Sequence, residues 1–167
     1  MTTPRVIGVD PGETTAWGLV EGDRRALALG ELTYDAEGAH LARLIAEWHP
    51  VAVVVEVVKR VHPVMRKGRS GISTTQAMAL YAAGRRAERV IGAARAAGVQ
   101  VIEASAEEWR AAVIGKAQAD NATIDRVLRV RLRDFPAPRK SNNHERDALG
   151  IATYGAAMAM RTMSRAS

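Results

Sequence analysis

This 167-residue chain contains no cysteine, and aromatic residues make up only 4% of it, with a single phenylalanine. The lack of cysteine excludes disulfides, zinc–thiolate sites and a thiol nucleophile, and it suits a reducing cytoplasm. No apolar run approaches the roughly 18 residues that span a bilayer, and the N-terminus does not resemble a signal peptide. We therefore expect a cytoplasmic protein whose core consists mainly of aliphatic residues.

Acidic residues are outnumbered, because 24 lysines and arginines face 18 aspartates and glutamates and give a net charge of +6. Such a basic balance favours nucleic acid or an anionic membrane as a partner. The basic residues gather in two segments, 59–69 and 126–140, in which Asp134 is the one acid. The segments include the candidate phosphate contacts Lys59, Arg60, Arg66, Lys67, Arg69, Arg139 and Lys140.

Hydrophobic patterning predicts an α/β domain that extends over residues 1–167, with residues 163–167 as a flexible tail. Apolar runs predict strands at residues 6–10, 16–20, 26–33, 51–58 and 99–103. Helical periodicity predicts helices at residues 38–49, 74–97, 121–133 and 144–162, and a further helix begins after the N-cap Ser105. Residues 62–73 and 136–143 are predicted to be loops. This order predicts a mixed sheet with helices on its faces.

Three acidic residues occupy positions where a folded core does not favour a charge. Asp10 ends the first predicted strand, Glu56 interrupts the most apolar strand, and Asp147 lies in the first turn of the last predicted helix. A buried carboxylate costs several kcal/mol unless it is paired or bound to a metal. Converging carboxylates can hold Mg²⁺, and two such ions can promote phosphodiester hydrolysis. His144 lies three residues before Asp147, so on a helix it can reach the same ion.

Each of these residues also has a purely structural interpretation. Asp10 precedes Pro-Gly and can be a simple turn residue, while Asp147 can interact with the helix dipole. A single histidine such as His144 is more often structural than a metal ligand. The metal-site hypothesis therefore rests on the combination of the four residues.

Several stretches of the chain resemble, in order and spacing, the motifs of the RuvC-like Holliday junction resolvases, which have an RNase H-like fold. The stretches are Gly8-Val9-Asp10-Pro11-Gly12 with Gly18, Val53-Val54-Val55-Glu56, Glu108-Trp109-Arg110 with Gly115-Lys116, and residues 143–152. Residues 71–84 are more similar to the phage-encoded branch. The resemblance extends from about residue 6 to residue 155.

The resemblance implies an RNase H-like mixed five-stranded sheet and a homodimer that nicks two strands of a four-way junction symmetrically. It implies a site for two Mg²⁺ ions, for which Mn²⁺ would substitute, formed by Asp10, Glu56, His144 and Asp147. Arg110 matches a position where a basic residue supports the scissile phosphate. Asn121 stands where many members have lysine, so Lys116 is expected to compensate. Lys59 replaces an aromatic residue that stacks on opened bases in bacterial members.

Other functions share parts of this pattern. Another RNase H-like nuclease, acting on RNA–DNA hybrids or flaps, would have the same acidic residues. The first motif also resembles the phosphate loop of actin-like kinases and ATPases, although the chain has neither the second phosphate loop nor the length of those proteins. A non-catalytic DNA-binding protein on the same fold would not need all three acids. We expect no membrane partner and no small-molecule cofactor.

Overall fold

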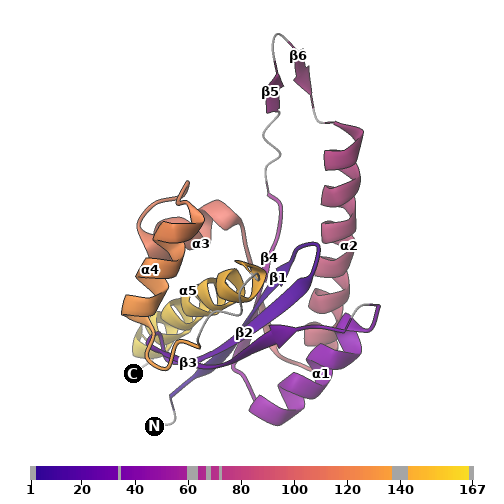
Figure 1. Cartoon of the computed structure of the whole chain (residues 1–167). Coiled ribbons are helices and arrows are strands. Elements are labelled where there is room, and N and C mark those ends of the chain that lie inside the picture. Colours follow the sequence, from indigo (N-terminus) through magenta and orange to yellow (C-terminus); the bar gives the residue numbers. More distant parts are fainter. Residues whose placement is uncertain are drawn as a thin grey trace.

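The computed structural model describes residues 3–33, 35–59, 64–66, 69–71, 73–136 and 143–165. Its centre is a five-stranded sheet in the order β3-β2-β1-β4-β7 (Figure 1). The strands are β1 (Arg5–Pro11), β2 (Thr15–Glu21), β3 (Arg25–Glu31), β4 (Ala52–Glu56) and β7 (Gln100–Ala104). Strands β1, β2 and β3 are antiparallel neighbours, whereas β1, β4 and β7 run parallel. The predicted mixed five-stranded sheet is confirmed.

Helices cover both faces of the sheet. One face packs against α1 (Glu37–Trp48) and the C-terminal half of α2 (Thr74–Ala96), with Ile7, Val53 and Val55 in the shared core. The other face packs against the remaining helices, α3 (Ala106–Ile114), α4 (Asn121–Arg131) and α5 (Asn143–Arg165). Because the central strands are buried on both faces, they are almost continuously apolar.

The alternation of side chains along β1 and β4 determines which face each acidic residue occupies. Val6 and Val54 belong to the core beneath α5, whereas Val9 and Val55 belong to the core beneath α1 and α2. Successive side chains of a strand point to opposite faces. Asp10 and Glu56 therefore both lie on the face covered by α5.

Helix α5 lies unusually close to β1 and β2 because glycine occupies the points of contact. A Cβ added to Gly8 would collide with the backbone of Ala148 and Ala152, and one added to Gly18 would lie 2.7 Å from the Leu149 nitrogen. Side chains at these two positions would push the helix outward. The close approach brings the start of α5 to the edge of the sheet that holds Asp10.

The structure differs from the sequence-based prediction in several segments, and the ends of β3 and α4 also lie two residues before the predicted residues 33 and 133. Residues 62–73 were predicted to be a loop, but they include a two-stranded antiparallel sheet of β5 (Val64–Arg66) and β6 (Arg69–Gly71). Strand β4 ends at Glu56, two residues earlier than predicted. Helix α5 begins at Asn143 and continues to Arg165, so much of the predicted tail is helical and residues 166–167 lie outside the described residues. Within the described part of the chain, no helix is long and apolar enough to cross a membrane.

Candidate active site

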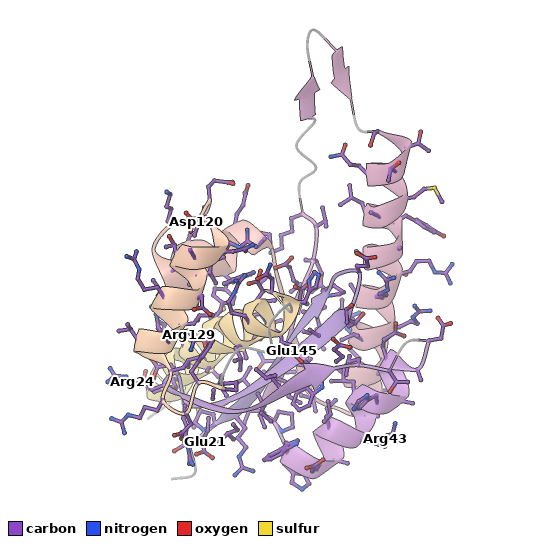
Figure 2. The ribbon with its side chains drawn as sticks, in the orientation of Figure 1. Glu21, Arg24, Arg43, Asp120, Arg129 and Glu145 are labelled. Carbon is purple, nitrogen blue, oxygen red and sulfur yellow. The ribbon has the colours of Figure 1, made fainter. Side chains whose placement is uncertain are left out.

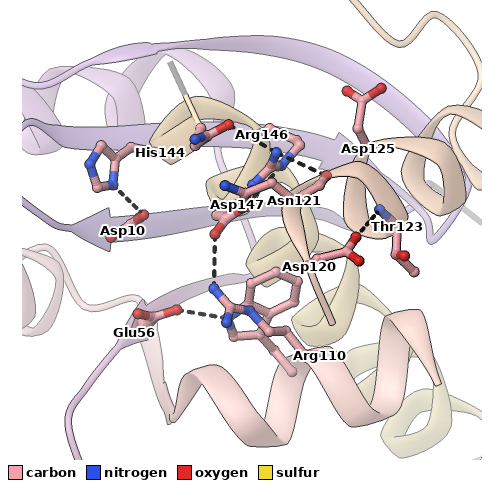
Figure 3. Close-up of polar contacts among 12 residues, drawn as sticks. Asp10, Glu56, Arg110, Asp120, Asn121, Thr123, Asp125, His144, Arg146 and Asp147 are labelled. Atoms are coloured by element: carbon pink, nitrogen blue, oxygen red, sulfur yellow. Dashed lines mark hydrogen bonds and ion pairs between the residues drawn. The ribbon is translucent and has the colours of Figure 1, made fainter. Parts of the chain in front are cut away.

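The acidic residues meet at one edge of the sheet, where β1 and β4 end. Val9 pairs with Val55 in the parallel ladder, so the next residues, Asp10 and Glu56, lie side by side. Asp147 enters from α5, just beyond the first turn of that helix, and His144 lies one turn before it (Figure 3). Asp10 and Asp147 are each only 7% exposed. The structure thus brings together all four residues that the sequence singled out.

Asp10 is held by a turn and by the imidazole of His144. Its Oδ1 accepts a hydrogen bond of 3.0 Å from the Gly12 nitrogen, and its Oδ2 lies 2.8 Å from His144 Nδ1. Gly12 has no side chain at the place where the imidazole packs, and a Cβ there would collide with the ring. The hydrogen bond with Asp10 raises the pKa of His144, and the negative charges of Asp10, Asp147 and Glu56 act in the same direction.

Glu56 is a buried acid whose pKa lies well above its ordinary value. Its Oε2 accepts a hydrogen bond of 2.7 Å from Nε1 of Trp109, a fully buried residue of α3. Burial raises the pKa of Glu56 to about 7, and the negative charge of Asp10 contributes to the rise, while the bond from Trp109 opposes it. A positive charge near this carboxyl group would stabilise its ionised form and lower its pKa.

Two arginines hold the Asp147 carboxylate, one on each oxygen. Arg146 donates from Nε and Nη2 to Oδ1, with the Nε bond at 3.0 Å, and Arg110 of α3 donates from Nη2 to Oδ2 at 3.1 Å. Arg146 also donates to Asn121 at the start of α4 and to the Asn143 side chain. Asp147 is therefore fixed to three helices around the site.

The donor set suits a divalent cation that prefers oxygen ligands, because three carboxylates and one imidazole converge on this edge. In the described residues, however, no three such side chains already have the arrangement of a metal site. Each carboxylate is instead engaged by a neighbouring donor, namely His144, Trp109 or an arginine. Repulsion from Asp10 and Asp147 also raises the pKa of Glu56, and a bound cation would relieve it. The residues present thus fit a metal site whose ligands must first exchange partners.

A cavity of about 590 Å³ opens beside Glu56, between the end of β4 and helix α3, and it is lined in part by Arg110 and Gln118. Lys59 also lines it and forms an ion pair with Glu108 Oε2 at 2.7 Å. The same Glu108 oxygen accepts a bond from the Ser105 nitrogen, which completes the predicted cap of α3. The bond from Lys59 lowers the pKa of Glu108. One predicted phosphate contact, Lys59, is therefore held by an acid of the protein itself.

The other predicted DNA contacts are less well placed by the structure. Arg110 lies in the site, whereas Lys116 is exposed between α3 and α4, near Asp120. Arg66 and Arg69 lie on β5 and β6, for which the backbone alone is described. The residues that lie outside the described part of the chain are Arg60, Lys67, Arg139 and Lys140.

Sequence reasoning did not assign roles to two residues that support the site. Trp109 and Arg146 donate hydrogen bonds directly to the acids. In the sequence they are neighbours of the candidate site residues Arg110 and Asp147. Trp109 follows Glu108 in a stretch that resembles the family motifs, and a buried indole needs an acceptor for its N–H. Arg146 offered no such signal, because an arginine in a polar helix start is normally exposed.

The chain is similar to known proteins over almost its whole length. No protein-family model matches the chain. It is 28% identical over 180 residues to the crossover junction endodeoxyribonuclease RuvC of Roseiflexus sp. strain RS-1, covering 96% of this chain and 97% of that protein. The Thermus thermophilus RuvC structure superposes with a TM-score of 0.67 at 23% identity, covering 94% of this chain and 96% of that chain. The chain is RuvC-like.

A second structure, T. thermophilus RuvC in complex with Holliday junction substrate, aligns with a TM-score of 0.67 at 25% identity. The alignment covers 95% of this chain and 96% of the T. thermophilus RuvC chain. These matches extend over nearly the full length of both partners. The family resemblance inferred from the motifs is confirmed.

Proposed function

We propose that this RuvC-like chain is a Mg²⁺-dependent endonuclease that resolves four-way (Holliday) DNA junctions by paired symmetric nicks. The observation that carries the proposal is the meeting of Asp10, Glu56, Asp147 and His144 at one edge of the sheet. The relatives support it, since one is named a crossover junction endodeoxyribonuclease and another was solved with a Holliday junction substrate. The protein acts as a single nuclease domain in the cytoplasm.

Asp10, Glu56, His144 and Asp147 would together hold two Mg²⁺ ions, for which Mn²⁺ would substitute. When bound, such ions would supply the Lewis acidity that makes a water molecule nucleophilic and that stabilises the leaving oxygen of a phosphodiester. Asp10, Glu56 and Asp147 supply hard oxygen ligands, and neutral His144 supplies a nitrogen. Trp109 orients Glu56 through its Nε1 hydrogen bond, and Arg146 orients Asp147. These two residues would keep the Glu56 and Asp147 carboxylates in position during the reaction.

Basic side chains near this edge bind the phosphates of the junction. Arg110 lies next to Asp147 and lines the cavity beside Glu56, so it is placed to support the scissile phosphate. Lys59 contacts phosphate once its ion pair with Glu108 is broken. Lys116 lies directly after the C-terminal end of α3. The remaining proposed phosphate contacts are Arg60, Arg66, Lys67, Arg69, Arg139 and Lys140.

Symmetric cutting of a two-fold substrate requires two related sites, so we propose a homodimer. The N-terminal half of α2 supports this proposal because it extends beyond the sheet (Figure 2), and most of its side chains are exposed. Met78 and Tyr81 on this half are 69% and 67% exposed. Large exposed apolar side chains on a projecting helix are typical of a protein interface.

A nicking assay with Asp10→Asn tests the metal-site proposal. This variant should bind a four-way junction but lose Mg²⁺-dependent nicking, because one carboxylate ligand is removed. Asp125→Asn is the matched control, since Asp125 is on α4 and pairs with Arg129 at 2.6 Å. The control should nick normally. Substantial nicking by Asp10→Asn would refute the site.

The choice of substrate is tested with the wild-type protein. A four-way junction, a flap, an RNA–DNA hybrid and a plain duplex of the same sequence are compared at equal concentration. We expect the four-way junction to be cut fastest, with nicks at symmetric positions. Faster cutting of the hybrid or the flap would favour another RNase H-like nuclease.

A further inference from the structure

The two arginines that hold Asp147 are bound to the protein in different ways. We propose that Arg110 is a built-in counterion that occupies Oδ2 of Asp147 in the metal-free protein and gives up this oxygen when a divalent cation binds, whereas Arg146 keeps Oδ1 throughout. The proposal rests on the metal site proposed above. It assigns the oxygen of Asp147 that faces the metal and the residue that competes for it.

Arg146 has the contacts of a permanent anchor. Its guanidinium is buried and donates to Asp147 Oδ1, to the Asn121 carbonyl and side-chain oxygens, and to Asn143 Oδ1. Withdrawal of Arg146 would leave several buried donors and acceptors unsatisfied, which is costly. Oδ1 of Asp147 is therefore not available to a ligand.

Arg110 has the contacts of an exchangeable partner. Its side chain is 26% exposed, and its hydrogen bond to Asp147 is the single bond from Nη2 at 3.1 Å. Its Nε is buried but has no hydrogen-bond partner among the described residues. The guanidinium also lies 5.2 Å from the centre of the Trp109 ring, an interaction that does not depend on Asp147. Arg110 is therefore held to Asp147 by fewer bonds than Arg146 is, and its partly exposed guanidinium can exchange this bond for water.

The position of Arg110 makes the exchange necessary. Its guanidinium donates to Asp147 Oδ2 (Figure 3), and its positive charge also lowers the pKa of Glu56, so it lies near both carboxylates that a shared cation would need. Two positive charges at this place repel each other, so the arginine and a metal ion compete for Oδ2. Arg110 also lines the cavity beside Glu56. Once displaced, it stays tethered by the Trp109 ring and faces the space where a phosphate would lie.

Mn²⁺ binding to the full-length protein without DNA tests the exchange, with free Mn²⁺ followed by electron paramagnetic resonance. Arg110→Gln removes the competing charge, and we expect it to bind Mn²⁺ about tenfold more tightly than the wild type, which corresponds to about 1.4 kcal/mol. Arg110→Lys keeps the charge and should bind within about threefold of the wild type. Thermal unfolding of each variant confirms that it is folded.

The matched control is Arg95→Gln, which removes a cation that pairs with Glu103 at 3.3 Å rather than with Asp147. It should change Mn²⁺ affinity by less than about twofold. A second control adds Asp10→Asn to the wild type and to Arg110→Gln, and Mn²⁺ binding should be lost in both.

The outcomes separate the two proposals. If Arg110→Gln does not tighten binding while Asp10→Asn still abolishes it, the metal site stands and the exchange is refuted. If Arg110→Gln and Arg110→Lys tighten binding equally, charge is not the cause and the exchange is also refuted. If Asp10→Asn leaves Mn²⁺ binding unchanged, the proposed metal site itself is wrong.

Discussion

Replacement of Glu56 by glutamine should stabilise the metal-free protein at alkaline pH. Glu56 is surrounded by apolar strands and by two other acids, and its pKa is raised to about 7 from 4.5. Glutamine has nearly the same shape, and its side-chain oxygen can accept the hydrogen bond that Trp109 donates. The substitution therefore removes the charge without removing the contact.

The size and sign of the effect follow from the two pKa values. One pKa unit corresponds to about 1.36 kcal/mol, so a rise from 4.5 to about 7 corresponds to about 3 kcal/mol. Between these pH values the folded state holds a proton that the unfolded state has released, so stability falls as pH rises. Below pH 4.5 both states are protonated and Glu56 costs nothing. Above about pH 7 the full cost is present.

The assay is urea unfolding in EDTA at several pH values from 4 to 8, with Glu56→Gln compared to the wild type. Their free energies of unfolding should be similar at about pH 4, and the variant should be more stable by about 3 kcal/mol at about pH 8. For a protein of this size that difference is roughly 6–12 °C in Tm. The variant should lose the further stabilisation that Mg²⁺ gives the wild type.

Glu103→Gln is the control, because Glu103 is 45% exposed in its ion pair with Arg95. Its difference from the wild type should stay small and nearly constant over the same pH range. The reasoning would be refuted if Glu56→Gln were less stable than the wild type at pH 8, or if the difference between them did not change with pH.

Three further predictions concern packing, the histidine and the basic segment. Gly8→Ala should destabilise the protein by at least about 1–3 kcal/mol, because the added Cβ would meet the α5 backbone. Gly92→Ala, at an open position on α2, should instead stabilise the protein by up to about 1 kcal/mol. Thermal unfolding that ranks the two variants oppositely would contradict the close approach of α5 to β1. Nicking should fall as pH drops through the raised pKa of His144, because the protonated ring cannot bind metal. His144→Asp should move this fall to lower pH. Full activity of His144→Ala would show that His144 is not a metal ligand. Neutralising three cations of the basic segment 59–69 should reduce the slope of log binding constant against log salt concentration for the junction by roughly two to three. An unchanged slope would show that these side chains do not contact DNA. The three are Arg66, Lys67 and Arg69.

Much of the secondary structure could be predicted because its signals are local. The Ser105 and Glu108 pair predicted the start of α3, where both capping bonds form. Helical periodicity located α2 to within one residue of its observed end. The β5–β6 pair was missed because its strands are three residues each and carry no alternating apolar pattern.

The sequence by itself determined which acids could share a site. Asp10 and Glu56 interrupt or end apolar strands, where a core does not favour a charge, and the spacing of His144 and Asp147 puts both on one side of a helix. Only the tertiary structure decided what holds each carboxylate. Trp109, Arg110 and Arg146 reach the acids through the packing of α3 and α5, and the glycines of β1 and β2 set the depth of α5. Such contacts depend on distances between elements far apart in the chain, which local patterns do not encode.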